Sequence, residues 1–198
     1  MIEATDVFEV FEKHRGDAIV LAGGLSGYKH WHEYSTNQKR DVGNFVGTMG
    51  AIAPAALGVA LAQPDEKVVL FDSEGSLLMN LGLLATTADQ APRNFYHFLL
   101  DNESYATTGG QPVPSAKTID YAGLAKDAGY VAAYSFDDLE DFASSLKEIL
   151  DQEGPVFVAL KIVPEIENVP IGLRESAPTR STAEVIRDLR EELGIGES

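Results

Sequence analysis

The sequence predicts a single α/β domain with a three-layer α/β/α architecture and a central, mostly parallel sheet. Short apolar runs alternate along the chain with segments of helical character, and each run is apolar at successive positions. Strands that helices cover on both faces have this composition. The length of 198 residues agrees with this class, since domains commonly contain about 100–200 residues.

The first half of the chain contains a long segment, Gly23 to Gly50, that is rich in glycine, polar and aromatic residues. Segments of this length without regular structure are usually functional or disordered, and we expect a loop. The regular elements expected here are an amphipathic helix over about 2–13, a strand over 18–22, a buried helix over 51–62, a strand over 67–71 and a buried helix over 77–88.

The second half continues the same alternation. Its expected elements are a strand over 94–100, a loop over 101–116, a helix over 121–128, a strand near 130–134, a helix over 138–150 and a strand over 155–162. Prolines at 164, 170 and 178 then mark an irregular arm. Ser181 and Glu184 have the spacing of a capping box, which predicts a final helix over 183–193. We therefore divide the chain into a domain over 1–162 and a C-terminal arm and helix over 163–198.

The composition excludes several classes of protein. The chain has 31 acidic and 15 basic side chains, a formal charge of −16, which argues against a nucleic-acid partner because phosphates are bound by patches of Lys and Arg. It has no cysteine, so disulfides, zinc–thiolate sites and iron–sulfur clusters are excluded. No apolar run is long enough to span a membrane, and no basic region precedes an export signal. We expect a cytoplasmic protein without a membrane partner.

Polar residues are concentrated in the segments 23–50, 72–80 and 101–111, which follow predicted strands. Ligands of open α/β sheets bind at the carboxyl ends of the strands. Glu74 begins a helix after one strand and Asn102 follows the next, so a carboxylate and an amide oxygen come together there. Such hard oxygen ligands favour Mg²⁺ or Ca²⁺, and the helix N-terminus favours a diphosphate. The alternative is an ordinary turn in which Ser76 and Glu74 cap the helix and Asn102 forms an Asx turn.

The amino-acid sequences of these segments resemble those of a known family. Glu74 to Asn80, Leu100 to Tyr105 and Thr108 to Gln111 resemble the thiamine-diphosphate (ThDP) motif, and in particular the sulfopyruvate and phosphonopyruvate decarboxylases. Asn44 to Gly50 and Leu57 to Ala62 match the same group. The resemblance covers roughly residues 1–162, in order and with compatible spacings.

This resemblance implies roles for individual residues. Glu74, the side chain of Asn102 and the main-chain carbonyl of Ser104 would bind Mg²⁺, with Ca²⁺ or Mn²⁺ as alternatives. The other implied cofactor contacts are Gly75 and Ser76 at the diphosphate, Gly24 in the turn beside it, Gly47 at the aminopyrimidine, and Thr48, Met49 and Tyr105. Met49 would be the apolar wedge that bends the cofactor, and Met49 and Thr108 would lie at the reacting end. The alternative for Met49 is core packing.

Two features depart from the family. Ser73-Glu74-Gly75 stands where the family has Gly-Asp-Gly. Glu is longer than Asp by one C–C bond, about 1.5 Å, which would alter the metal geometry. Ser73 would be strained if this position required a positive φ.

The second departure is that the chain lacks the pyrimidine-binding half of these enzymes. The resemblance therefore implies a partner (α) subunit that supplies the catalytic Glu, in an α2β2 or larger assembly, and decarboxylation of a small 2-oxo acid to an aldehyde. The alternatives are another ThDP reaction, such as carboligation or that of a 2-oxo acid oxidoreductase β subunit, and a degenerate, non-catalytic partner subunit.

Cationic and donor residues for a second anion on the substrate are Lys29, His30, His32, Thr107, Thr108 and Gln111. A metal pair at His30 and His32 is a weaker alternative to a lid or interface loop in which Trp31 is buried against a neighbour. We expect His14 at the surface and His97 as a satisfied core residue. In the C-terminal arm we expect packing on a neighbouring subunit, with Arg174 or Arg180 reaching an active site as the alternative.

Overall fold

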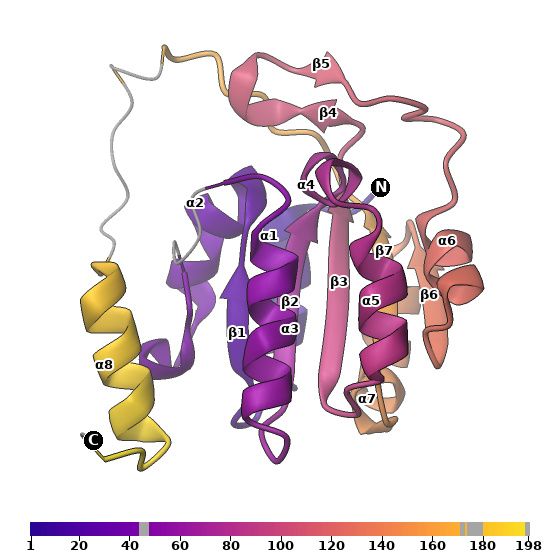
Figure 1. The fold of residues 1–198 in the computed structure, drawn as a ribbon. Coiled ribbons are helices and arrows are strands. Elements are labelled where there is room, and N and C mark those ends of the chain that lie inside the picture. Colours follow the sequence, from indigo (N-terminus) through magenta and orange to yellow (C-terminus); the bar gives the residue numbers. More distant parts are fainter. Residues whose placement is uncertain (44–47, 171–172, 174–179, 197–198) are drawn as a thin grey trace.

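The computed structural model describes residues 1–43, 48–170, 173 and 180–196. Within these residues a five-stranded sheet forms the centre, with the order β1-β2-β3-β7-β6, and every pairing in it is parallel. The strands are β1 (Ile19–Ala22), β2 (Val68–Ser73), β3 (Phe95–Asp101), β6 (Ala132–Phe136) and β7 (Val156–Lys161). Helices lie on both sides of the sheet (Figure 1), which confirms the predicted α/β class.

Alternate residues of each strand enter different cores. Val69 and Phe71 of β2 pack with Phe8 of α1 (Ala4–Glu12) and with α7 (Leu139–Asp151), whereas Val68 and Leu70 pack on the opposite face. That opposite face is covered by α3 (Ile52–Ala62), α5 (Leu83–Gln90) and α6 (Tyr121–Ala128). The continuous apolar runs of the central strands therefore reflect burial on two faces.

The segment from Gly23 to Gly50 was expected to be a loop, and this expectation is wrong for its first part. Residues Gly24–Tyr34 form a helix, α2, and Gln38–Arg40 a 3₁₀ turn, η1. Trp31 of α2 is buried in the chain's own core, with its ring 5.7 Å from those of Phe8 and Phe11, and not against a neighbouring subunit. Its packing fixes α2 beside α1.

The helix predicted over 77–88 is divided in two. Helix α4 (Glu74–Met79) ends at Asn80, and α5 begins at Leu83. The side-chain amide of Asn80 donates to the carbonyl of Gly50 over 3.1 Å, which holds the break in place. The break positions α4 alone at the carboxyl edge of the sheet.

The loop after β3 contains a small hairpin. Strands β4 (Ser104–Tyr105) and β5 (Gln111–Pro112) pair antiparallel around the 3₁₀ turn η2 (Ala106–Thr108), and they lie above the carboxyl edge of the sheet (Figure 1).

The C-terminal helix α8 (Thr182–Glu192) begins with the predicted capping box, in which both reciprocal hydrogen bonds are present. Its Val185 is buried against the face that carries α3, and the guanidinium of Arg180 donates to the carbonyls of Gln38 and Asp41. The helix therefore packs on its own chain, beside η1. Among the described residues, no helix is long and apolar enough to cross a membrane.

Candidate functional site

Three of the predicted metal-site residues come together at the carboxyl ends of β2 and β3. The backbone N–H of Ser104 donates to Oε1 of Glu74 over 2.9 Å and also lies 2.9 Å from Oδ1 of Asn102. The hydroxyl of Ser104 donates to the same Asn102 oxygen over 3.1 Å. The parallel pairing of β2 with β3 brings these residues together, because it places the ends of both strands at one edge.

Glu74 is fully buried, and only one of its carboxylate oxygens has a partner. Its Oε2 has no hydrogen bond from any residue that the structure describes. Burial raises the pKa of Glu74 to about 7, although backbone hydrogen bonds oppose the shift. A buried carboxylate with an unpartnered oxygen is costly unless a cation satisfies it.

The oxygen atoms of Glu74 and Asn102 fit a hard divalent cation. Glu74 offers a charged oxygen, and Asn102 offers a neutral amide oxygen close to it. In the described part of the chain, no group of three or more His, Cys, Asp or Glu side chains is arranged to hold a metal ion, so a soft or all-carboxylate site is not present there. Carboxylate, amide and carbonyl oxygens suit Mg²⁺ or Ca²⁺.

The N-terminus of α4 forms a cradle beside this carboxylate. The hydroxyl of Ser76 accepts the N–H of Gly50 over 3.0 Å. A β-carbon on Gly75 would lie 2.8 Å from the ring of Tyr105 and 3.3 Å from Cε of Met49. A larger residue there would require Tyr105 to move, and Met49, Gly75 and Tyr105 lie together. Met49 is 48% exposed, so core packing does not explain it.

Gly24, a predicted cofactor contact, lies close to the start of α4. It has a φ of +69°, and a β-carbon on it would be 2.9 Å from Cβ of Ser73. Ser73 itself has a φ of −112°, so the strain expected for a non-glycine residue at this position does not occur. Ser73 instead fills the space that Gly24 leaves.

Of the remaining predicted cofactor and reaction residues, those that the structure describes are exposed. Thr48 is exposed, and Gly47 lies outside the described residues. Thr108 is exposed on η2, where its hydroxyl contacts Oε1 of Gln111 over 3.1 Å. The hairpin that carries Thr108 and Gln111 lies over the carboxyl edge of the sheet (Figure 1).

Two of the predicted anion-binding residues already have acidic partners. Nζ of Lys29 lies 3.0 Å from Glu167, and Nε2 of His30 lies 2.8 Å from Glu165. Both acids belong to the arm after β7, whose Glu167 N–H also donates to the carbonyl of Ala106. Lys29 and His30 therefore tie α2 to the arm, and a pair of His30 with His32 as metal ligands is not supported.

The other histidines and the arm arginine are placed as follows. His14 is exposed, as predicted. His97 is buried in the core, but it is not satisfied as expected: neither ring nitrogen has a hydrogen bond among the described residues, and Nε2 lies 3.5 Å from Oδ2 of Asp72. Arg180 anchors α8 and does not approach the carboxyl edge. Arg174 lies outside the described residues.

Sequence reasoning missed two residues beside the site. Tyr121, the first residue of α6, is buried, and loss of solvation and then the charges of Asp101 and Glu74 raise its pKa. Lys161 ends β7 and pairs with Asp101 and Glu103 on either side of Asn102. The only local signal for Lys161 was its position as a polar residue at the end of an apolar strand, because its partners Asp101 and Glu103 are distant in sequence.

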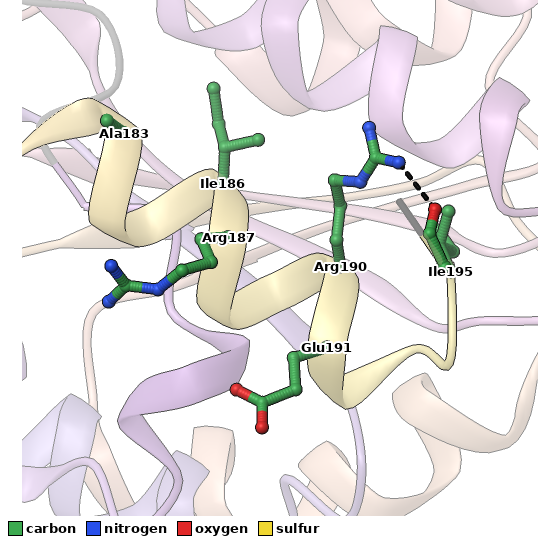
Figure 2. A pocket seen from close by; sticks show the side chains of 7 residues that line it. Ala183, Ile186, Arg187, Arg190, Glu191 and Ile195 are labelled. Carbon is green, nitrogen blue, oxygen red and sulfur yellow. Dashed lines mark hydrogen bonds between the residues drawn. The ribbon is translucent and has the colours of Figure 1, made fainter. Parts of the chain in front are cut away.

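A surface hollow of about 770 Å³ lies elsewhere, along α8. Figure 2 shows Ile186, Arg187 and Arg190 around it, with Arg190 hydrogen-bonded to the carbonyl of Gly196. None of the predicted site residues lines it. The carboxyl edge therefore remains the candidate site.

The comparison with protein families decides what kind of site this is. A family model described as "Thiamine pyrophosphate enzyme, C-terminal TPP binding domain" matches residues 22–160. The chain belongs to this family. Thiamine pyrophosphate is another name for ThDP, and the match contains both Glu74 and Asn102, so the convergence described above lies within the family's cofactor-binding domain.

Several ThDP-family proteins resemble the chain. A phosphonopyruvate decarboxylase of Streptomyces viridochromogenes is 39% identical over 154 residues, 77% of this chain and 37% of that protein. Sulfopyruvate decarboxylase subunit beta of Methanothermobacter thermautotrophicus is 34% identical over 171 residues, 86% of this chain and 88% of that protein. The crystal structure of benzoylformate decarboxylase from Polynucleobacter necessarius has a TM-score of 0.71 at 17% identity, over 83% of this chain and 34% of that one, which supports the ThDP-binding fold. The chain spans about a third of the phosphonopyruvate decarboxylases that it matches.

Proposed function

We propose that the chain is the diphosphate- and metal-binding subunit of a ThDP-dependent decarboxylase that acts on a 2-oxo acid of the sulfopyruvate or phosphonopyruvate type and releases an aldehyde. The convergence of Asn102 and Ser104 at Glu74 carries the proposal, because the second carboxylate oxygen of Glu74 is buried without a hydrogen-bond partner among the described residues. The relatives named above support the reaction class.

Different residues would have different roles in the site. Glu74, Asn102 and the carbonyl of Ser104 would hold Mg²⁺, while Gly75 and Ser76 would contact the diphosphate. ThDP, when bound, supplies the electron sink that decarboxylation of a 2-oxo acid requires. Met49 would support the bent cofactor from its position beside Gly75, and Thr108 would approach the substrate from the hairpin.

A partner subunit is part of the proposal. The Methanothermobacter relative is called a beta subunit and has similar length, and the longer decarboxylases extend well beyond the matched region. Met49 and Met79 are 48% and 58% exposed, which would suit coverage by a pyrimidine-binding subunit that brings the catalytic Glu. We propose an α2β2 or larger cytoplasmic assembly in which the outer face of α8 contacts a neighbouring subunit.

Reconstitution tests the proposal. The chain is combined with the proposed pyrimidine-binding (α) subunit, and CO₂ release from sulfopyruvate and phosphonopyruvate is followed with and without ThDP and Mg²⁺. Thermal stabilisation of the complex by ThDP with Mg²⁺ is measured in parallel. We expect both signals. Stabilisation without CO₂ release would favour another ThDP reaction, and absence of both would indicate a non-catalytic partner subunit.

A further inference from the structure

Lys161 lies against the turn that carries two of the proposed metal ligands. Its Nζ is 2.9 Å from Oδ2 of Asp101 and 2.8 Å from Oε1 of Glu103. These two acids flank Asn102, and Glu103 directly precedes Ser104. One ammonium group therefore bridges carboxylates on both sides of a proposed ligand.

The turn contains a residue in an unfavourable backbone conformation. Glu103 has a φ of +64°, in the left-handed region that residues with a β-carbon seldom adopt. Its N–H donates to Oδ1 of Asp101 over 3.1 Å, and its carbonyl accepts the N–H of Val113 over 3.2 Å. Such conformations persist only where the surroundings hold them, and they are concentrated at functional sites.

This conformation is coupled to the direction of the ligands. In the turn as it stands, the N–H of Ser104 reaches both Asn102 and Glu74. A change of φ at Glu103 would rotate Ser104 away from Glu74, because Glu103 is the only residue between Asn102 and Ser104. The conformation of Glu103 therefore decides whether Asn102 and Ser104 face Glu74.

Repulsion between carboxylates explains why the turn needs the ammonium group of Lys161. Asp101 and Glu103 are like charges close to each other, and Glu74 is a third nearby. Their repulsion would open the turn, and it is stronger where water is partly excluded, as at the Asp101 side chain, which is 10% exposed. Lys161 is fixed relative to Asp101, since the two residues are directly paired in the β3–β7 register.

We infer that Lys161 is a positioning residue for the metal site: its ammonium holds Asp101 and Glu103 so that Asn102 and Ser104 face Glu74. This inference rests on the proposed function. It adds that the Mg²⁺ requirement depends on a side chain that is itself neither a metal ligand nor a cofactor contact.

The test uses the assembled complex with the partner subunit and measures the Mg²⁺ concentration that half-saturates ThDP binding, by titration calorimetry. The variants are Lys161→Met, Lys161→Arg and Lys147→Met as the matched control, since Lys147 makes a similar 2.6 Å pair with Asp151 on the exposed face of α7. Loss of a charge-assisted contact is expected to raise the Mg²⁺ requirement of Lys161→Met about tenfold. Lys161→Arg is expected to stay close to the wild type because a guanidinium also bridges carboxylates, and Lys147→Met to be unchanged.

Saturating Mg²⁺ separates positioning from a general loss of structure. It is expected to restore the ThDP affinity of Lys161→Met to that of the wild type, which it would not do for a misfolded subunit. A Mg²⁺ requirement equal to that of the wild type in Lys161→Met would overturn the inference and leave the proposed function intact. Absence of Mg²⁺-dependent ThDP binding in the wild-type complex would overturn both.

A second pair of variants does not depend on Lys161→Met folding. Glu103→Ala removes the carboxylate and keeps the strained β-carbon, whereas Glu103→Gly removes both. We expect Glu103→Ala to raise the Mg²⁺ requirement and Glu103→Gly to recover most of the loss, because glycine adopts a positive φ freely. A Mg²⁺ requirement equal to that of the wild type in Glu103→Ala would overturn the inference.

Discussion

The backbone N–H of Ser104 donates to Oε1 of Glu74 over 2.9 Å and so joins the start of α4 to the turn after β3. The bond occupies one oxygen of the carboxylate and leaves Oε2 buried without a partner among the described residues. Under the proposed function the side chain would reach Ser104 through Oε1 and a cation through Oε2, so the length of Glu would be part of the geometry.

Shortening or neutralising Glu74 should weaken metal-dependent ThDP binding to different degrees. Glu74→Asp retracts the carboxylate by about 1.5 Å, one C–C bond, so it cannot reach both partners. Glu74→Gln keeps the reach and removes the charge that a divalent cation needs. Titration calorimetry of ThDP at fixed Mg²⁺ should show a loss of about tenfold for Asp and a larger loss for Gln. Unchanged affinity in Glu74→Asp would show that Ser104 and the metal do not share this carboxylate.

The pH dependence of stability in the metal-free subunit should contain the Glu74 titration. Burial raises its pKa to about 7 in the folded state, above the value in the unfolded chain. The stability from this group is full below about pH 4 and is lost as the pH rises to about 7, because the folded state then loses its extra proton. The loss is at most about 3 kcal/mol.

Urea unfolding in a chelator at pH 5 and pH 8 measures this effect. Glu74→Gln is the control, since it cannot ionise, and its stability should change less between the two pH values. Saturating Mg²⁺ should oppose the loss in the wild type, because a cation stabilises the charged carboxylate. Parallel pH profiles for the wild type and Glu74→Gln would contradict the assignment.

Adding a methyl group at Gly75 should disturb the cofactor cradle. A β-carbon there would lie 2.8 Å from the ring of Tyr105, which must then move. We expect Gly75→Ala to fold and to lose about tenfold or more in ThDP affinity. Gly58→Ala is the matched control: it lies in α3 with no atom within 4 Å of the new carbon, and should stabilise the helix by about 0.5–1 kcal/mol. Equal ThDP affinity in the two variants would argue against close packing at Gly75.

Gly24 and Ser73 should be energetically coupled. Gly24→Ala adds a carbon 2.9 Å from Cβ of Ser73 at a φ of +69°, so it should destabilise the chain by about 1–3 kcal/mol. Gly16→Ala has a φ of +56° and no neighbour within 4 Å, and it measures the cost of the conformation alone. In the double variant Gly24→Ala/Ser73→Gly, the free energy of unfolding should rise again by the part of the loss that is due to the clash, as measured by denaturant unfolding. Strict additivity would show that the two residues do not compete for space.

The sequence predicted β1, β2, β3 and β7 well because each is a largely apolar run, and two-sided burial requires that local pattern, whereas β6 is only half-buried and lies two residues later than predicted. It also placed Glu74 and Asn102 at one edge, since parallel strands end together. Helix α2 was missed because Gly24 and Gly27 lower helix propensity. Only packing supports it: a β-carbon on Gly27 would lie 3.1 Å from the backbone of Ala22, and Trp31 fills the core against α1.

By itself the sequence determined the α/β class, the position of the polar edge and the residue types that meet there, because these depend on neighbours along the chain and on the rules of parallel sheets. The tertiary structure alone decided that Lys29 and His30 pair with the arm acids Glu167 and Glu165, and that Lys161 holds Asp101 and Glu103. These charges are separated by up to 138 residues, so their pairing depends on where the packed sheet places each side chain, and no local pattern records it.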